Sequence, residues 1–155
     1  MCLPRGRIRI CNQRTAFLPG LRSIRSTPIL LRYTPGHSPG SICMQESRDG
    51  LLFTGDTFYP GGTLVAHLKE SDFTVYRNSI SYLIALTRQE TAPVNRLCPA
   101  HNKAWAPKEN LALVSEAFDR IARGQAEYEE QDKTRLYHFD GFQVRLSASS
   151  LKTVN

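Results

Sequence analysis

Short apolar runs alternate with turns that contain Gly or Pro in the segment between Thr27 and Gly62. The runs are PILLRYT (Pro28–Thr34), SICMQ (Ser41–Gln45) and LLFT (Leu51–Thr54). Runs of this length between Gly and Pro residues are typical of β-strands. The dipeptide Asp49-Gly50, directly before the third run, is a frequent hairpin turn. We therefore expect consecutive strands that form a meander.

Apolar residues recur with helical spacing after this meander. Ser71-Asp72 can cap a helix N-terminus, and the apolar spacing that follows predicts a helix over about Asp72–Arg88. A second apolar stripe runs from Leu111 to Ile121. We expect Pro107 to be the first residue of that second helix and Gly124 to end it.

Two more segments have the pattern of strands. Pro93–Pro99 lies between the helices, and Arg135–Leu146 alternates around a turn at Asp140-Gly141. With 155 residues, 41% of them hydrophobic, the chain has about the size of one domain and enough apolar side chains for a core. These elements predict an α/β chain of the α+β type, followed by a polar tail at 147–155.

The apolar runs and the cysteines bear on the compartment. Every apolar run is much shorter than the roughly 20 residues of a membrane-spanning helix, so no span is expected. The four cysteines form no CxxC pattern and are too scattered for a disulfide framework. We interpret them as free thiols in a reducing compartment, which predicts a cytoplasmic protein.

Residues 1–26 differ in composition from the remainder. The first acidic residue is Glu46, whereas many arginines precede it, in a chain with a net charge of +6. We expect a basic, poorly ordered leader in front of a folded part that spans 27–146. An organelle transit peptide is the alternative, although Pro4 and Pro19 interrupt any helix that it would form. Binding to nucleic acid is not expected.

Three residues with metal-ligating side chains directly follow strand-like runs. His37 lies in TPGHSPG, Asp56 in FTGDTFY and His101 in LCPAHNK. If the strands are neighbours, these side chains converge at one edge of a sheet. Imidazole and carboxylate are ligands of zinc and similar cations. Each residue taken singly is more typical of an ordinary turn, so the metal-site hypothesis depends on the repeated setting, which His67 and His138 lack.

The motifs TPGHSPGS, LLFTGD and LCPAH resemble, in this order, three metal-binding motifs of the metallo-β-lactamase superfamily. The segment SDFTVY is similar to a helix of its glyoxalase-II-like and acyl-CoA thioester hydrolase branch. The resemblance runs from about Thr27 to Leu146. It implies a zinc-dependent hydrolase of thioester or ester bonds, with Fe or Mn as alternative metals. For the fold it implies part of an αββα sandwich, roughly one sheet with two flanking helices.

The resemblance also implies roles for single residues. His37 would complete one metal site, Asp56 would bridge both metals, and His101 would belong to the second site. Metals in such a site lower the pKa of a bound water to about 7, which would make Asp56 part of the catalytic machinery. Tyr59, in the loop after Asp56, is expected to contact the substrate, and simple packing is the alternative.

One motif of the family has no counterpart in this chain. No HxHxDH sequence precedes Thr27, and the full two-metal site takes more histidines than the four present. We expect a fragment that corresponds to the C-terminal half of the fold, with a half that assembles with another chain and a decayed remnant as alternatives. Little activity is expected from this polypeptide alone, since each metal would lack ligands.

A sheet without its twin would expose an apolar face. Such a face predicts a partner chain or a homodimer. Two functions therefore stay open from the sequence: part of a metal-dependent hydrolase, or an inactive half-fold that acts as a binding module.

Overall fold

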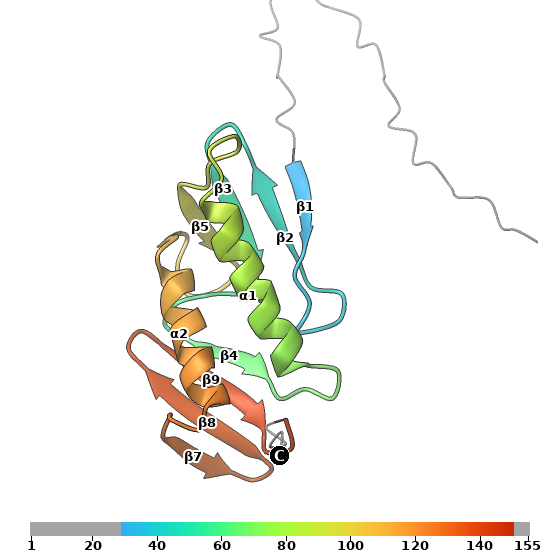
Figure 1. Ribbon diagram of the computed structural model, residues 1–155, viewed down its shortest axis with the longest axis vertical. Coiled ribbons are helices and arrows are strands. Elements are labelled where there is room, and N and C mark those ends of the chain that lie inside the picture. The colour runs from blue at the N-terminus through green and yellow to red at the C-terminus, as the bar shows by residue number, and fades with distance from the viewer. Residues whose placement is uncertain (1–28, 151–155) are drawn as a thin grey trace, which may run out of the picture.

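The computed structural model describes residues 29–150, which contain helices and strands in mixed order (Figure 1). In chain order the elements are β1 (Ile29–Tyr33), β2 (Ile42–Glu46), β3 (Leu51–Gly55), β4 (Thr63–Ala66), α1 (Phe73–Thr87), β5 (Arg96–Pro99), β6 (Ala106–Pro107), α2 (Asn110–Ala122), β7 (Tyr128–Gln131), β8 (Thr134–Phe139) and β9 (Phe142–Ser147). The expected leader, 1–26, and residues 151–155 of the expected tail lie outside the described residues. The domain bounds therefore stay predictions.

The described strands lie in two sheets. The first has the order β1-β2-β3-β5-β6 and the second the order β4-β9-β8-β7. The pairs β1–β2 and β2–β3 are antiparallel, which confirms the predicted meander. Because β3 and β5 are parallel, the strands β1, β3 and β5 all run in the same direction. Their carboxyl ends therefore meet at one edge of the first sheet.

The predicted α+β fold with two helices is confirmed, but the strands form two sheets rather than roughly one. The second sheet includes two strands that the sequence did not predict. One is β4, only four residues long, which pairs in parallel with β9 far along the chain. The other is β7, YEEQ, whose residues are all exposed. Short or fully polar strands show little alternation of apolar and polar residues. Whether such a segment forms a strand therefore depends on its pairing partner rather than on its local sequence.

Helix α1 agrees closely with its prediction. Asp72 is the N-cap, and its side chain accepts a hydrogen bond of 2.9 Å from the backbone N–H of Val75. This bond satisfies one of the free N–H groups of the first helical turn.

The prediction for the start of α2 is wrong. Pro107 belongs to β6, where it pairs with Arg96 of β5, and the helix begins at Asn110. An edge strand tolerates proline because the missing N–H is not needed for pairing, so Pro107 can serve in β6. The predicted end is confirmed, since α2 ends at Ala122 and Gly124 follows with a φ of 66°.

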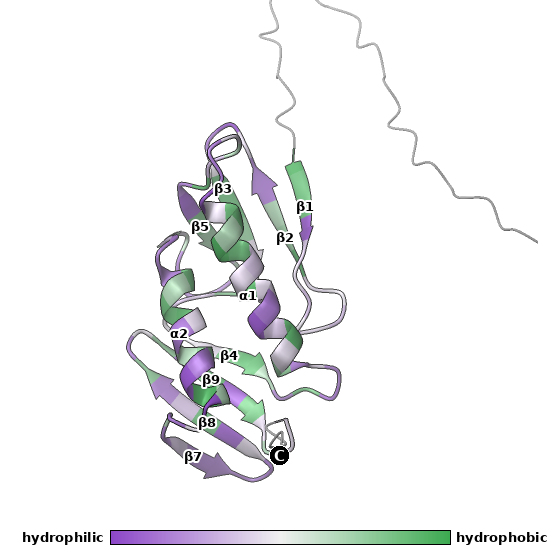
Figure 2. Ribbon diagram, in the orientation of Figure 1, coloured by the Kyte–Doolittle hydropathy of each residue, from purple (hydrophilic) through white to green (hydrophobic). Residues whose placement is uncertain are grey.

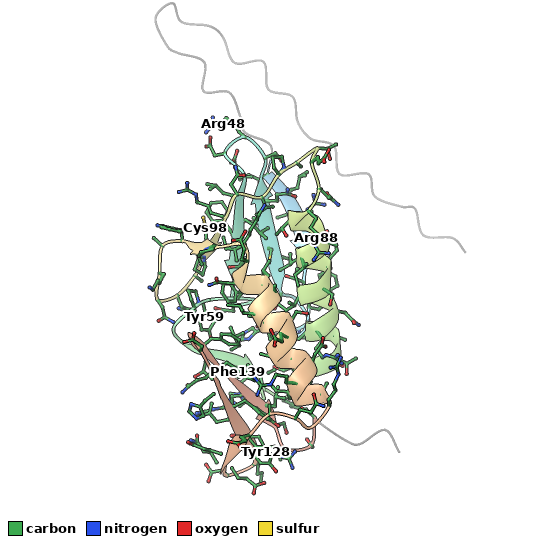
Figure 3. All side chains as sticks on the ribbon, turned by 60° about the vertical axis from the view of Figure 1, so that its left-hand side comes forward. Arg48, Tyr59, Arg88, Cys98, Tyr128 and Phe139 are labelled. Atoms are coloured by element: carbon green, nitrogen blue, oxygen red, sulfur yellow. The ribbon has the colours of Figure 1, made fainter. Side chains whose placement is uncertain are left out.

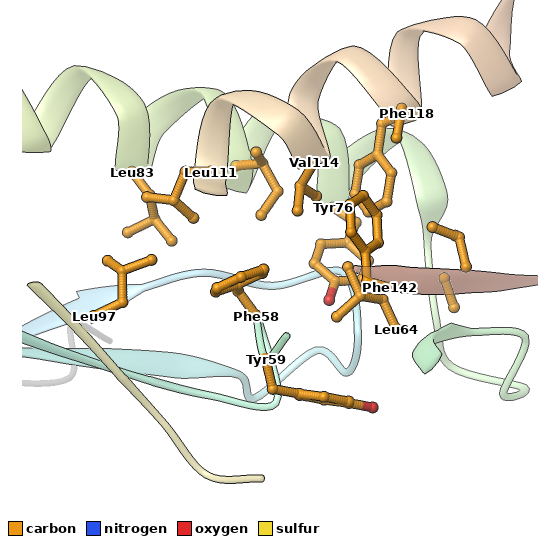
Figure 4. Packing of buried hydrophobic residues seen from close by; sticks show 14 of the residues in the cluster. Phe58, Tyr59, Leu64, Tyr76, Leu83, Leu97, Leu111, Val114, Phe118 and Phe142 are labelled. Atoms are coloured by element: carbon orange, nitrogen blue, oxygen red, sulfur yellow. The ribbon is translucent and has the colours of Figure 1, made fainter. Parts of the chain in front are cut away.

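The two helices cover the same side of both sheets (Figures 1 and 3). Figure 4 shows Leu83, Leu111 and Phe118 pointing from the helices toward strand and loop residues such as Phe58 and Leu97. These side chains belong to one buried cluster that includes residues of both sheets. The ring of Tyr76 meets that of Phe118 edge-on at 5.1 Å, and burial raises the pKa of Tyr76 well above its ordinary value. The core therefore lies between the helices and the sheets.

The other face of the first sheet is apolar and uncovered by the described residues. It comprises Ile29, Leu31, Tyr33, Ile42, Met44 and Phe53, and Leu31 is 67% exposed. These residues are neighbours, because Leu31 pairs with Met44 and Met44 pairs with Phe53. Figure 2 shows hydrophobic colour on the first part of β1, although this strand lies at the edge of its sheet. We call these six residues the open face.

Within 29–150, neither helix has the length and hydropathy that a membrane span requires. Cys43 and Cys98 are free thiols, whereas Cys2 and Cys11 lie outside the described residues. Cys98 lies on the side of the first sheet away from the helices (Figure 3). Burial raises the pKa of both described thiols.

Candidate functional site

The structure brings His37, Asp56 and His101 together at the edge where β1, β3 and β5 end. The Nε2 atom of His37 lies 3.9 Å from Oδ2 of Asp56, and Nε2 of His101 lies 2.8 Å from Oδ1. The two imidazoles thus face different oxygens of one carboxylate. The Asp56 side chain is 46% exposed and the His37 side chain 18% exposed. The site is therefore open to solvent on the side of Asp56.

His37 is held in place by a hydrogen bond of its ring and by contacts between its loop and the start of α1. Its Nδ1 bonds to the backbone carbonyl of Val65 at 2.9 Å. A carbonyl can only accept, so Nδ1 carries the hydrogen and Nε2 is turned to Asp56. The hydroxyl of Ser71 donates to the carbonyl of His37 at 2.7 Å, and the N–H of Asp72 donates to that of Gly36 at 2.9 Å.

Gly36 lets this loop touch the helix. Its φ is 134°, in the range that side chains rarely adopt, and a Cβ at this position would overlap the backbone of Tyr76. The hydroxyl of Ser79, one turn further along α1, donates to the carbonyl of Pro35 at 2.6 Å. Contacts from four positions of the SDxxxYxxS segment thus fix the loop that carries His37.

Asp56 follows an irregularity at the end of β3. The pairing register shifts between Phe53 and Gly55, and Gly55 has a φ of 52°. Such a bulge redirects the residue that comes next. The hydroxyl of Tyr76 donates to the carbonyl of Thr57 at 2.7 Å and lies 3.3 Å from that of Asp56. Tyr76 therefore connects the Asp56 loop to the helix that also holds His37.

His101 is placed by contacts between its loop and the loop after Asp56. Asn102 has a φ of 67° and donates from Nδ2 to the carbonyl of Pro60 at 3.1 Å. The ring of His101 meets that of Tyr59 edge-on, with centroids 5.0 Å apart. The hydroxyl of Tyr59 donates to the carbonyl of Thr63 at 2.5 Å, and Figure 4 shows this side chain on the side of Phe58 away from the helices.

Burial and the charge of Asp56 raise the pKa of Tyr59. The phenol therefore stays neutral and remains a hydrogen-bond donor at physiological pH. The structure places Tyr59 beside His101, next to the open site. The structure shows how Tyr59 packs against His101, and its contact with substrate stays a prediction.

Ring nitrogens and carboxylate oxygens face one another at the site. With Nδ1 of His37 donating to a carbonyl, Nε2 is the nitrogen that faces the carboxylate of Asp56. A proton on Nε2 or a metal ion between the two groups would make this contact attractive. A hydrogen bond from the far nitrogen to a backbone carbonyl is also the usual support of a metal-bound histidine. The donor chemistry therefore fits a metal.

The number of donors is smaller than a metal usually takes. His37 and Asp56 could supply one ligand each toward one ion, and Asp56 and His101 could do the same toward a second. A tetrahedral zinc normally takes three or four protein ligands. Across 29–150, no group of three or more His, Cys, Asp or Glu residues is arranged around a single point. The described residues alone therefore supply fewer donors than a complete metal site needs.

The other two histidines have different surroundings. His138 lies on β8 with its Nε2 3.4 Å from a carboxylate oxygen of Glu129. His67 follows β4, and burial together with the nearby charge of Arg145 lowers its pKa. The motifs taken singly did not predict that Ser71, Tyr76 and Val65 support the site. The spacing SDxxxY could have indicated the first two, but no sequence signal points to a backbone carbonyl.

Curated proteins that match this chain include acyl-coenzyme A thioesterases. Acyl-coenzyme A thioesterase MBLAC2 of Gallus gallus is 28% identical over 97 residues, which are 60% of this chain and 32% of the relative. The Homo sapiens protein of the same name is 30% identical over 87 residues, which are 56% of this chain and 30% of the relative. The chain thus spans about a third of the length of the curated relatives it matches.

Solved structures with a similar arrangement include metallo-β-lactamases. FIM-1 from Pseudomonas aeruginosa, in a mono-zinc form, has a TM-score of 0.48 at 18% identity, over 64% of this chain and 42% of that chain. TTHA1623, in a di-iron-bound form, has a TM-score of 0.45 at 23% identity, over 54% of this chain and 39% of that chain. The sequence model of the metallo-beta-lactamase superfamily matches residues 21–101, more than half of the chain. This chain belongs to the metallo-beta-lactamase superfamily.

Proposed function

We propose that this chain carries part of the active site of a metal-dependent hydrolase. The observation that supports it most is the pair of imidazoles around Asp56, with Nδ1 of His37 fixed by the Val65 carbonyl. His37 and Asp56 would hold one metal, and Asp56 and His101 a second. Bound metal would supply an activated water at neutral pH and stabilise the oxyanion that forms on a carbonyl.

The residues of this chain would orient these donors. Asp56 presents one oxygen to each histidine, and its loop is connected to α1 through Tyr76. Tyr59 packs against His101 and would border the bound substrate. Zinc is the metal we favour for nitrogen and oxygen donors, with iron or manganese as alternatives.

We infer that the substrate is a thioester or ester, and specifically an acyl-CoA thioester. The support is the relatives, which are named acyl-coenzyme A thioesterases. The remaining metal ligands would come from additional polypeptide, so the isolated 155-residue chain is expected to turn over little substrate. The free thiols of Cys43 and Cys98 favour the reducing cytoplasm as its compartment.

Native mass spectrometry of the protein isolated from its own source tests this proposal. We expect a species heavier than 17.5 kDa that carries two metal ions and hydrolyses an acyl-CoA, with the activity lost on chelation and restored by zinc. A metal-free species of 17.5 kDa without hydrolytic activity would contradict it.

A binding module is the second candidate, because the open face leaves a row of large apolar side chains in solvent. Exposed apolar patches of this kind mark surfaces of association. We infer that the open face is covered by another chain, and a second copy of this chain is the occupant we test. Identical apolar faces can pack on each other about a two-fold axis.

Replacing Leu31 by glutamate is expected to weaken such a dimer at least about tenfold, because it places a charge in the buried centre of the contact. Sedimentation velocity over a range of concentrations measures the dissociation constant. Leu113→Glu is the matched control, since Leu113 is an exposed leucine on α2, away from the open face. A monomer at all concentrations, or equal effects of both variants, would contradict the dimer.

A further inference from the structure

A cleft opens directly beside the site, between the loop that carries His101 and the start of α2. It has a volume of about 500 Å³, and its lining includes Pro60, Asn102, Lys103, Trp105 and Asn110. Asn102 is the neighbour of His101 in sequence and bonds to Pro60, which follows Tyr59. The cleft is therefore adjacent to the proposed metal ligands. Its size lies within the range of small-molecule sites.

The lining combines an aromatic ring with positive charge. Trp105 is 58% exposed, which is unusual for so large an apolar side chain. The guanidinium of Arg96 lies over its ring, 5.9 Å from the centroid. Lys103 is the one charged residue among those that line the cleft, and no Asp or Glu lines it. The surface thus offers a ring for stacking beside cationic groups.

A nucleotide presents the complementary chemistry. Adenine stacks on aromatic side chains, and phosphates pair with Lys and Arg. The amides of Asn102 and Asn110 add hydrogen-bonding groups at the border of the cleft. A plain acyl chain would gain nothing from Lys103 or from these amides. The charge of the lining therefore favours the nucleotide end of a coenzyme over its acyl end.

We propose that the cleft at Trp105 and Lys103 binds the adenosine phosphate part of a coenzyme A thioester. This inference rests on the proposed function, because it assigns one end of the same substrate. It places the nucleotide on the loop 102–105 and leaves the thioester to the site at Asp56. Loop 102–105 then determines which carrier group the site accepts.

Trp105 is the only tryptophan of the chain, so its fluorescence reports the cleft alone. We expect a saturable change when the 155-residue protein is titrated with adenosine 3′,5′-bisphosphate, and competition by coenzyme A. Lys103→Met should weaken binding of the bisphosphate at least about fivefold, because a charged hydrogen bond is lost. Trp105→Ala should weaken binding of the bisphosphate by a similar factor or more, because stacking is lost. Calorimetry measures the affinity of this variant.

Lys133→Met is the matched control, because this substitution also removes one positive charge, but from the turn between β7 and β8. No response to the bisphosphate at millimolar concentration, or equal weakening by both lysine variants, would overturn the proposal. A response to pantetheine or octanoate in place of the bisphosphate would also overturn it, by assigning the cleft to another part of the substrate.

The titration is independent of the hydrolase proposal. It is carried out with a chelator present, and His37, Asp56 and His101 do not line the cleft. Nucleotide binding without metal-dependent hydrolysis would support the cleft and count against the hydrolase. Hydrolysis without nucleotide binding would do the reverse.

Discussion

In the heavier, metal-loaded species proposed above, replacing Asp56 by alanine is expected to remove metal binding from the site and, with it, hydrolysis. The reason is that one carboxylate faces both histidines, so the substitution takes a ligand from both proposed ions at once. Loss of a supporting group outside the coordination shell already costs about 10- to 100-fold in affinity. Loss of this shared ligand should cost more than about 100-fold. Competitive titration with zinc measures the affinity, and an acyl-CoA assay measures the activity.

The same variant should still fold. The Asp56 side chain is about half exposed, and the hydroxyl of Tyr76, which holds its loop, donates to the backbone carbonyls of Asp56 and Thr57, which alanine keeps. Asp49→Ala is a matched control, because Asp49 is an exposed carboxylate in a turn and, among residues 29–150, its side chain pairs with the adjacent Arg48 alone. Unchanged zinc affinity and activity in Asp56→Ala, or equal losses in the control, would refute the proposed metal site.

The second large effect is expected from Gly36→Ala. Its Cβ would overlap the backbone of Tyr76, and its φ of 134° is strained for alanine. Neither the backbone of a helix nor a loop tied by Ser71 and Ser79 can move at little cost. Backbone strain and overpacking of about 1–3 kcal/mol each predict a loss of about 3 kcal/mol or more in the free energy of unfolding. Urea denaturation measures it.

Gly40→Ala gives the comparison in the same loop. Nothing lies within 4 Å of a Cβ at Gly40, and its φ is outside the strained range. That variant should be neutral or more stable by about 0.4–1 kcal/mol, because alanine restricts the unfolded chain. If Gly36→Ala unfolded at the same urea concentration as Gly40→Ala, the close contact between the loop and α1 would be disproved.

The local sequence predicted those parts of the fold that depend on nearby residues. The meander, the cap at Asp72 and the turn at Asp140-Gly141 each arise from residues a few positions apart. Strand β4 could not be predicted, because its partner β9 lies about eighty positions further on. Pro107 was misplaced because a proline suits both the start of a helix and an edge strand.

For the site, the sequence predicted which residues converge but not what holds them. The repeated setting of His37, Asp56 and His101 at strand ends was sufficient, because the three strands run in one direction. The Val65 carbonyl that fixes the His37 ring could not be predicted, because it is a backbone group of an unpredicted strand. The ligand roles of the three residues stay predictions.

The parallel pair β3–β5 gives the site a particular place in folding. Asp56 and His101 follow strands that are separated along the chain by β4 and the whole of α1. Parallel strands need a long crossover connection, and such long-range pairing is intrinsically slower than the closing of a local hairpin. We therefore expect Asp56 and His101 to come together after the local hairpins have formed. The proposed metal site therefore depends on the finished tertiary structure, because its residues come from segments that lie far apart in the chain.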